Sequence, residues 1–147
     1  MNASVKALGY VVIETMDVEA WLDFGRGVLG LQAVPSEGRL LFRMDEFVYR
    51  IDVRAGECDG VVAVGWDVGD QHSLEELAGS LSEAGYAVSE STGAMRAERE
   101  VDGLVIVRDP DDMFDIELFW ALRNAQEPFV SPNGALCVTN GRGLGHL

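Results

Sequence analysis

The sequence predicts an α+β fold in which a βαβββ module occurs twice in tandem, the two modules together forming one cupped mixed sheet. Three observations predict it. Short β-prone runs outnumber helical stretches, the order of the runs repeats in the second half, and the one helix of each module can cover only one face of its strands. At 147 residues, 48% of them hydrophobic, the chain is long enough to bury a core between the modules.

The first module begins with a strand and a helix. Residues 8–15 are rich in β-branched and aromatic side chains, and Asp17 follows where its side-chain oxygen can cap a helix. From Val18 to Leu29 apolar residues recur at helical intervals, and Gly30 is typical of a helix end. Three β-prone runs separated by turn residues complete the module: residues 31–34, 40–44 and 47–53.

The second module repeats this order. Residues 61–68 form a near-continuous apolar run, which predicts a strand. The next helix is predicted over residues 73–84, with Ser73 and Glu76 as a capping box and Gly85 as its end. The remaining predicted strands are residues 86–89, 104–108 and 114–120.

Matching landmarks indicate that the two modules arose by internal duplication. Asp17 corresponds to Asp70, and Gly30 to Gly85. The strands match in the same way, residues 41–45 with 105–109 and residues 49–53 with 115–119.

Composition narrows the choice of partners. Eleven basic and twenty-five acidic residues give a formal charge of −14, which repels phosphate backbones and anionic membranes, so neither nucleic acid nor membrane is an expected partner. The first 21 residues lack the features of a signal peptide, which makes the cytoplasm the expected location. Cys58 and Cys137 stand far apart without nearby histidines and indicate neither a disulfide framework nor a zinc site.

The end of the second module carries a family resemblance. Residues 109–112 (DPDD), followed by residues 114–119 (FDIELF), resemble the vicinal oxygen chelate superfamily of glyoxalases, antibiotic-resistance proteins and extradiol dioxygenases. In that superfamily the last strand of a module often carries a metal-binding glutamate. The resemblance therefore makes Glu117 a candidate metal ligand.

A closer resemblance, over nearly the whole chain, is to the two-domain extradiol dioxygenases of biphenyl and steroid catabolism. It rests on residues 8–10 (LGY), residues 29–31 (LGL) and, above all, residues 143–147 (GLGHL). It also includes several single positions: Trp21, Arg43, Asp45, Arg50, Val53, Gly56 and Glu57. In those enzymes the GLGH stretch opens the third module, and its histidine, here His146, is the first iron ligand.

The resemblance implies a division of the chain and a function. Residues 1–121 would be a non-catalytic amino-terminal domain, with modules at about 7–56 and 61–121. Residues 122–147 would be a linker and the start of a catalytic domain. The whole enzyme would use Fe(II) and O2 to cleave catechol-type aromatics such as 2,3-dihydroxybiphenyl, and a homo-oligomer is expected.

The chemistry needs a ferrous ion held by two histidines and one carboxylate, with open positions for the diol and O2. The chain has two histidines, and His72 is expected at the surface near the second helix, whereas His146 matches the family motif. Aligning residues 144–146 on residues 8–10 puts Tyr10 in a ligand's place, and the related place in the second module falls near Val64 or Gly65. These 147 residues alone are therefore expected to hold no catalytic or cofactor-binding residue, to bind no metal and to cleave no ring.

Glu117 has a structural interpretation beside the functional one. A buried carboxylate is costly unless it is paired, and Arg50 or Arg43 is the expected partner. In the alternative reading, the chain is a complete single-domain, glyoxalase-like protein that binds a small ligand or acts as a dimeric metal enzyme, with Glu117 and His72 as ligands. An extended tail over residues 122–147 would favour the half-enzyme, and a tail folded around metal in a dimer interface would favour the alternative.

Overall fold

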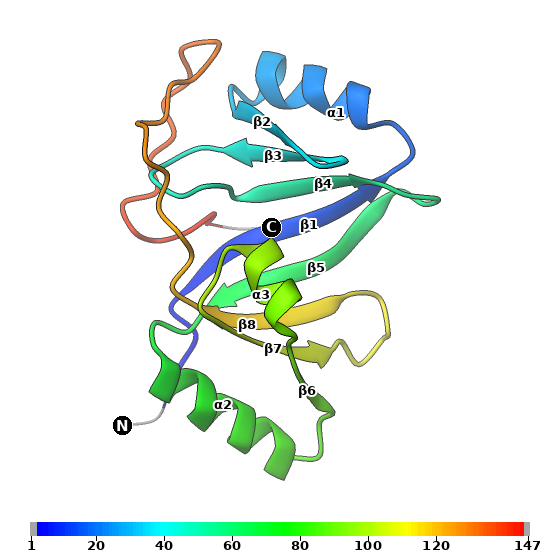
Figure 1. Cartoon of the computed structure of the whole chain (residues 1–147), viewed down its shortest axis with the longest axis vertical. Helices are drawn as coiled ribbons and strands as arrows, with labels where there is room; N and C mark the ends of the chain where they lie inside the picture. The colour runs from blue at the N-terminus through cyan, green and yellow to red at the C-terminus, as the bar shows by residue number, and fades with distance from the viewer. Residues whose placement is uncertain (1–2, 146–147) are drawn as a thin grey trace.

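The computed structural model describes residues 3–145 and contains one eight-stranded mixed sheet with the order β2-β3-β4-β1-β5-β8-β7-β6 (Figure 1). This confirms the predicted fold class. The elements are β1 (Ala7–Thr15), α1 (Val18–Asp23), η1 (Phe24–Val28), β2 (Gln32–Ser36), β3 (Arg39–Arg43), β4 (Ile51–Ala55), β5 (Gly60–Asp67), α2 (Gln71–Glu83), β6 (Val88–Glu90), α3 (Gly93–Arg99), β7 (Gly103–Arg108) and β8 (Asp115–Trp120).

The first module, β1 to β4, and the second, β5 to β8, are related by a pseudo-twofold axis between the antiparallel strands β1 and β5. Val11 pairs with Val64 at this axis. Each module then places its last strand parallel to its first, β4 beside β1 and β8 beside β5. Both modules therefore add their strands outward from the central pair.

The register corrects the landmark alignment by one residue. Asp52 lies opposite Val12, and Glu117 lies opposite Gly65. Since Val12 and Gly65 are equivalent about the axis, Asp52 and Glu117 are equivalent too, and residues 49–53 match 114–118 instead of 115–119. Leu41 lies opposite Asp52 and Ile106 opposite Glu117, so residues 41–45 likewise match 106–110 instead of 105–109. The difference matters because a shift of one residue moves a side chain to the other face of a sheet.

The first helix begins as predicted and changes type midway. Asp17 accepts a hydrogen bond from the Ala20 amide at 2.9 Å, as a capping residue does. After Asp23 the chain winds as a π-helix, where Gly25 lets the ring of Phe42 approach so closely that a Cβ would lie 2.3 Å from it. Gly30, at φ +70°, ends the segment.

The second helix begins two residues before the predicted start. Asp70 is its cap and accepts a hydrogen bond from the Ser73 amide at 2.8 Å, so the predicted capping box of Ser73 and Glu76 is wrong. Gly85 follows the helix at φ +92°.

The predicted strand over residues 47–53 is only partly formed. Asp45 accepts hydrogen bonds from the Phe47 amide at 3.2 Å and from Arg50 Nε at 2.9 Å, and this folds the chain back on itself before β4. The strand therefore begins at Ile51.

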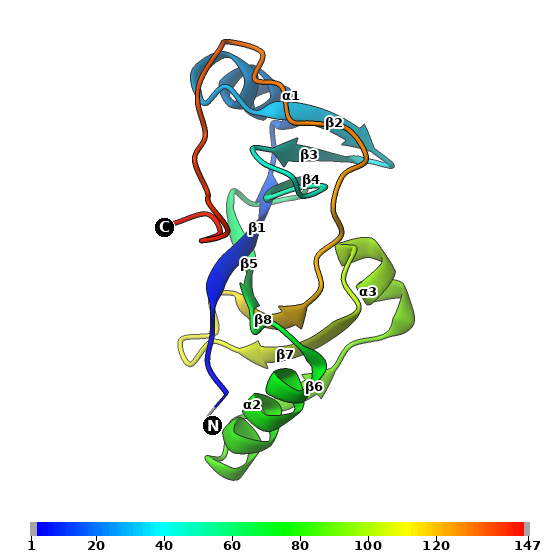
Figure 2. The same cartoon turned by 90° about the vertical axis from the view of Figure 1, so that its left-hand side faces the viewer.

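One helix was not predicted. Helix α3 is capped by Thr92, whose hydroxyl accepts a hydrogen bond from the Met95 amide at 3.1 Å, and it is followed by Glu100 in the left-handed region at φ 58°. Figure 2 shows α3 in the concavity between the two arms of the sheet, whereas α1 and α2 lie outside. We call this concave side the cup.

The chain after β8 has no helix or strand between residues 121 and 145, apart from two isolated bridges. It leaves the cup, crosses the outer strands of the first module and descends on the convex side (Figure 2). Near its end the Leu144 amide donates to the Leu8 carbonyl at 2.9 Å. Among residues 3–145, no helix combines the length and apolar character needed to cross a bilayer.

Candidate functional site

The middle of the cup is built on three adjacent strands. Tyr10 on β1 pairs with Gly65 on β5, which pairs with Glu117 on β8. Because Gly65 has no side chain, the Tyr10 ring can lie across it, and a Cβ there would stand 2.4 Å from the ring. The Tyr10 hydroxyl thereby reaches Glu117 and donates to its Oε2 at 2.5 Å.

Helix α3 supplies the cation of the site. Arg99 donates from Nε to Glu117 Oε2 and from Nη2 to Oε1, both at 2.7 Å. This is the bidentate geometry that makes an arginine–carboxylate pair strong and directional. We call Tyr10, Arg99 and Glu117 the cup cluster.

The cup cluster is buried. The residues Tyr10, Glu117 and Arg99 are 0%, 1% and 7% exposed. Burial raises the pKa of the Tyr10 phenol well above its ordinary value, and the neighbouring Tyr49 and Glu117 raise it further. For Arg99, burial alone would lower the pKa, but the hydrogen bond and charge of Glu117 outweigh it and raise the pKa of the guanidinium. The cluster therefore holds a neutral phenol and a charged arginine.

Aromatic packing fixes the Tyr10 ring. Phe119 stacks against it with centroids 4.9 Å apart, and Tyr49 lies tilted at 5.4 Å. The Tyr49 hydroxyl donates to the Arg99 carbonyl at 3.0 Å, which ties α3 to the first module. Burial also raises the pKa of the Tyr49 phenol.

A second buried carboxylate lies at the equivalent position of the first module. Asp52 Oδ2 contacts Arg39 at 2.9 Å and Arg54 at 2.7 Å. Glu98, on α3, joins this group through Arg54 at 2.9 Å. The short helix thus carries one residue bound to each half of the sheet and closes the cup from both sides.

Glu117 is paired with an arginine, as predicted, but the partner is Arg99 and not Arg50 or Arg43. Arg50 binds Asp45 at 2.8 Å and the Gly9 carbonyl at 2.8 Å. Arg43 donates to main-chain carbonyls, among them that of Glu127 at 2.7 Å. Both arginines hold loops and leave Glu117 to Arg99.

The two histidines do not join the cup cluster in the part of the chain that the structure describes. His72 is exposed in the first turn of α2, which packs on the face of the sheet that carries Leu118. Glu117 precedes Leu118 and points to the opposite face. His146, the candidate iron ligand from the family motif, lies outside the described residues.

The donors in the cup do not fit a ferrous ion. The two oxygens of Glu117 already accept three hydrogen bonds, two of them from a cation. Iron of this class needs imidazole beside carboxylate, and a neutral buried phenol with an arginine supplies neither a second ligand nor room for a positive ion. Within residues 3–145 no three His, Cys, Asp or Glu side chains gather as a metal-binding group.

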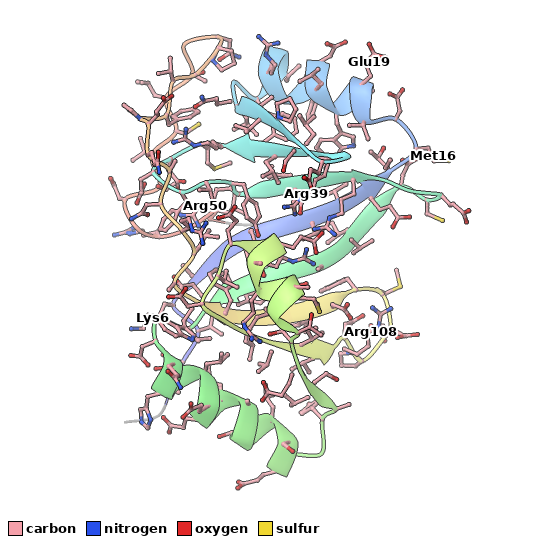
Figure 3. All side chains as sticks on the ribbon, in the orientation of Figure 1. Lys6, Met16, Glu19, Arg39, Arg50 and Arg108 are labelled. Atoms are coloured by element: carbon pink, nitrogen blue, oxygen red, sulfur yellow. The ribbon has the colours of Figure 1, made fainter. Side chains whose placement is uncertain are left out.

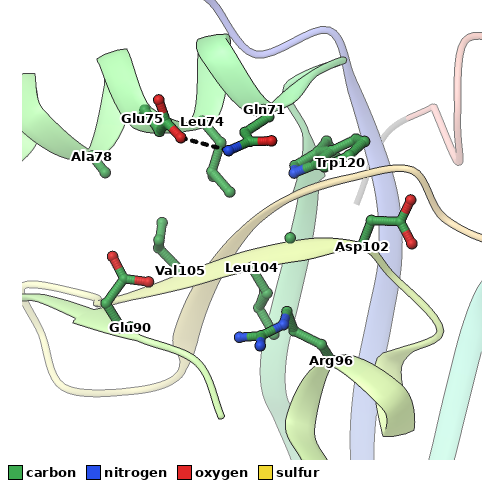
Figure 4. A pocket seen from close by; sticks show the side chains of 11 residues that line it. Gln71, Leu74, Glu75, Ala78, Glu90, Arg96, Asp102, Leu104, Val105 and Trp120 are labelled. Atoms are coloured by element: carbon green, nitrogen blue, oxygen red, sulfur yellow. Dashed lines mark hydrogen bonds between the residues drawn. The ribbon is translucent and has the colours of Figure 1, made fainter. Parts of the chain in front are cut away.

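A separate hollow of about 300 Å³ lies between α2 and β7 (Figure 4). Its walls carry both charges, with Glu75, Glu90 and Asp102 around Arg96. Glu75 accepts a hydrogen bond from Gln71 at 2.8 Å, and Arg96 donates to the carbonyl of Ser91 at 2.8 Å. It shares no lining residue with the cup cluster.

Comparison with known proteins shows which proteins the chain resembles. Residues 8–56 match the family model described as dihydroxybiphenyl dioxygenase BphC D1. The chain is 35% identical over 98% of its length to an iron-dependent extradiol dioxygenase of Rhodococcus jostii, and 33% identical over 98% to the biphenyl-2,3-diol 1,2-dioxygenase of Paraburkholderia xenovorans. It covers 48% and 49% of these two proteins, so it spans about half the length of the curated relatives it matches.

Solved structures of ring-cleaving dioxygenases resemble the fold of this chain. A crystal structure of catechol 2,3-dioxygenase superposes with a TM-score of 0.92 at 34% identity, over 98% of this chain and 49% of that one. The 2,2',3-trihydroxybiphenyl 1,2-dioxygenase of Sphingomonas wittichii superposes with a TM-score of 0.76 at 28% identity, over 83% and 43%. Over 98% of its length, the chain is therefore similar in sequence and in fold to about half the length of these extradiol dioxygenases.

Proposed function

We propose that these residues are the amino-terminal, non-catalytic half of an Fe(II)-dependent extradiol dioxygenase that cleaves catechol-type aromatics, such as 2,3-dihydroxybiphenyl, with O2. One observation carries the proposal. The cup, where a member of this family could hold metal and substrate, is occupied by a neutral phenol and an arginine that both donate hydrogen bonds to a carboxylate.

In this proposal residues 1–121 form a structural domain, and residues 122–147 link it to a catalytic half that would follow. His146 would supply one iron ligand there, and the other ligands would come from that half. The tail supports this division, because residues 121–145 run extended across the first module instead of folding around Glu117. That path does not suit a complete glyoxalase-like domain with Glu117 and His72 as its ligands.

The proposal includes location and assembly. An exposed thiol, Cys58, suits the reducing cytoplasm. A homo-oligomer is supported by apolar side chains left on the surface, among them Leu136 at 93% and Val138 at 75% exposed.

Turnover tests the proposal. The 147-residue chain, supplied anaerobically with Fe(II) and then with 2,3-dihydroxybiphenyl and air, should give no oxygen uptake above that of iron and buffer. A longer protein that continues through a following half should turn over the diol, and His146→Ala should abolish that turnover without unfolding it. Iron-dependent cleavage by the 147 residues alone would refute the proposal.

A further inference from the structure

An apolar groove lies on the outer face of the second module. It holds about 550 Å³ between α2 and strands β5, β7 and β8, and Leu77, Leu81, Trp66 and Ile116 form its walls. Tyr86, at its margin, is 49% exposed. An apolar groove of this volume on an otherwise acidic molecule is a candidate binding site.

The pseudo-twofold axis shows what covers such a surface. Trp66, Tyr86, Val107, Ile116 and Leu118 of the groove correspond to Ile13, Leu31, Phe42, Ile51 and Val53 of the first module. Those five belong to one packed cluster, and the tail residue Cys137 packs against it.

Two differences leave the second module open. The large ring of Phe42 is replaced by Val107, and within residues 3–145 no residue of the tail lines the groove. The difference shows in exposure: Leu31 is 3% exposed, whereas its counterpart Tyr86 is 49% exposed.

The same tail presents an unused apolar edge. In an extended segment successive side chains point to opposite sides. Cys137 faces its own module, and its neighbours Leu136 and Val138 are 93% and 75% exposed. One side of the tail thus packs on the first module, and the other side is free.

Charge favours the tail as the occupant of the groove. Residues 128–145 contain no acidic residue and one arginine, although the chain as a whole carries −14. The groove's margin, in contrast, includes Pro110 of the acidic turn formed by residues 109–112. Arg108 also lines the groove, but it already forms ion pairs with Asp112 and, at 3.0 Å, with Asp115. An acid-free segment is complementary to this margin, whereas most of the molecule's surface is not.

We propose that the groove binds the tail of a second copy, with Leu136 and Val138 inserted beside Tyr86 and Ile116, and that the exchange is reciprocal in a twofold dimer. In such a dimer each copy contributes its groove, which ten residues line, and its tail. This goes beyond the ring-cleaving function proposed above and stands or falls on association, whereas that function is tested by turnover.

Sedimentation velocity and light scattering of the 147-residue chain test the site. We expect a dimer that strengthens with salt, because salt screens the repulsion between two acidic copies. Tyr86→Glu in the groove and the double variant Leu136→Asp, Val138→Asp in the tail should each weaken association at least tenfold. A mixture of these two variants should recover a heterodimer, since one intact groove and one intact tail remain.

Met16→Glu is the matched control. Met16 is 69% exposed and lies just after the end of β1, and Lys6 lies just before its start (Figure 3). Substitution of Met16 should therefore leave association unchanged. Circular dichroism melts of every variant separate loss of association from loss of fold. A monomer at all concentrations up to the millimolar range, or groove and tail variants that associate like the unchanged chain, would overturn the proposal.

Discussion

Asp52 and Glu117 occupy equivalent positions in the two halves of the sheet, and both are buried carboxylates held by arginine. Asp52 is bound by Arg39 and Arg54, and Glu117 by Arg99. Glu117, which the family resemblance made a candidate metal ligand, and the equivalent Asp52 therefore both have guanidinium groups as their counter-charges. The arginines make the cup a structural core.

Arg99→Met should destabilise the chain strongly, because it leaves the Glu117 charge buried without a cation. Removing one partner of a buried pair costs about 3–5 kcal/mol. Urea denaturation should report this as a fall in the free energy of unfolding. Arg99→Met combined with Glu117→Gln should be more stable than Arg99→Met alone, since no unpaired charge remains.

A pair with an exposed arginine serves as the matched control for that prediction. Arg123 contacts Glu100 at 2.8 Å with its side chain 68% exposed. Arg123→Met should change stability by at most about 1 kcal/mol. Equal losses for Arg99→Met and Arg123→Met would contradict the account of the cup cluster.

Gly65→Ala should also destabilise the chain, by about 1–3 kcal/mol, because the new methyl group enters the space of the Tyr10 ring and pushes its hydroxyl away from Glu117. Gly79→Ala in α2 is the control. Nothing lies within 4 Å of a Cβ at that position, and alanine in a helix interior should add about 0.5–1 kcal/mol. Thermal melts of the two variants should shift in opposite directions, and a Gly65→Ala melt at or above that of the unchanged chain would be inconsistent with the packing.

Stability should fall at alkaline pH. Burial raises the pKa of the Tyr10 and Tyr49 phenols in the folded chain, whereas in the unfolded chain a phenol ionises near ~10. Above that pH the unfolded state loses protons that the folded state keeps, so the free energy of unfolding declines by up to about 1.4 kcal/mol per pH unit for each phenol. Below pH 10 the phenols are protonated in both states, so their contribution to the free energy of unfolding is fully present.

Denaturation series at several values between pH 9 and pH 12 measure the slope. Tyr49→Phe removes one of the two phenols and should make the decline shallower. The same slope with and without the Tyr49 hydroxyl would show that this phenol is not protected.

Much of the fold could be predicted from the sequence because the signals were local. The strand over residues 8–15 and the cap at Asp17 depend on neighbouring residues, and both are confirmed. The prediction that the strand begins at residue 47 was wrong. The hydrogen bonds that Asp45 accepts from Phe47 and Arg50 outweigh the β propensity of residues 47–50.

The cup cluster could be predicted only in part. Glu117 was identified from its place on the last strand of the second module. The cost of burying its charge then predicted an arginine partner. Arg99 was missed because α3 has seven residues, too few for helical periodicity to stand out. The one local signal was Thr92, a good capping residue ahead of the helix formers Ala94 and Ala97.

Iron binding tests the central claim, that Arg99 and not a metal ion balances the charge of Glu117 in the cup. The purified 147-residue chain can be incubated anaerobically with excess Fe(II), desalted and assayed for iron per chain. We expect less than a tenth of an equivalent, both in the unchanged chain and in Glu117→Gln. One equivalent retained by the unchanged chain and lost in Glu117→Gln would contradict the account.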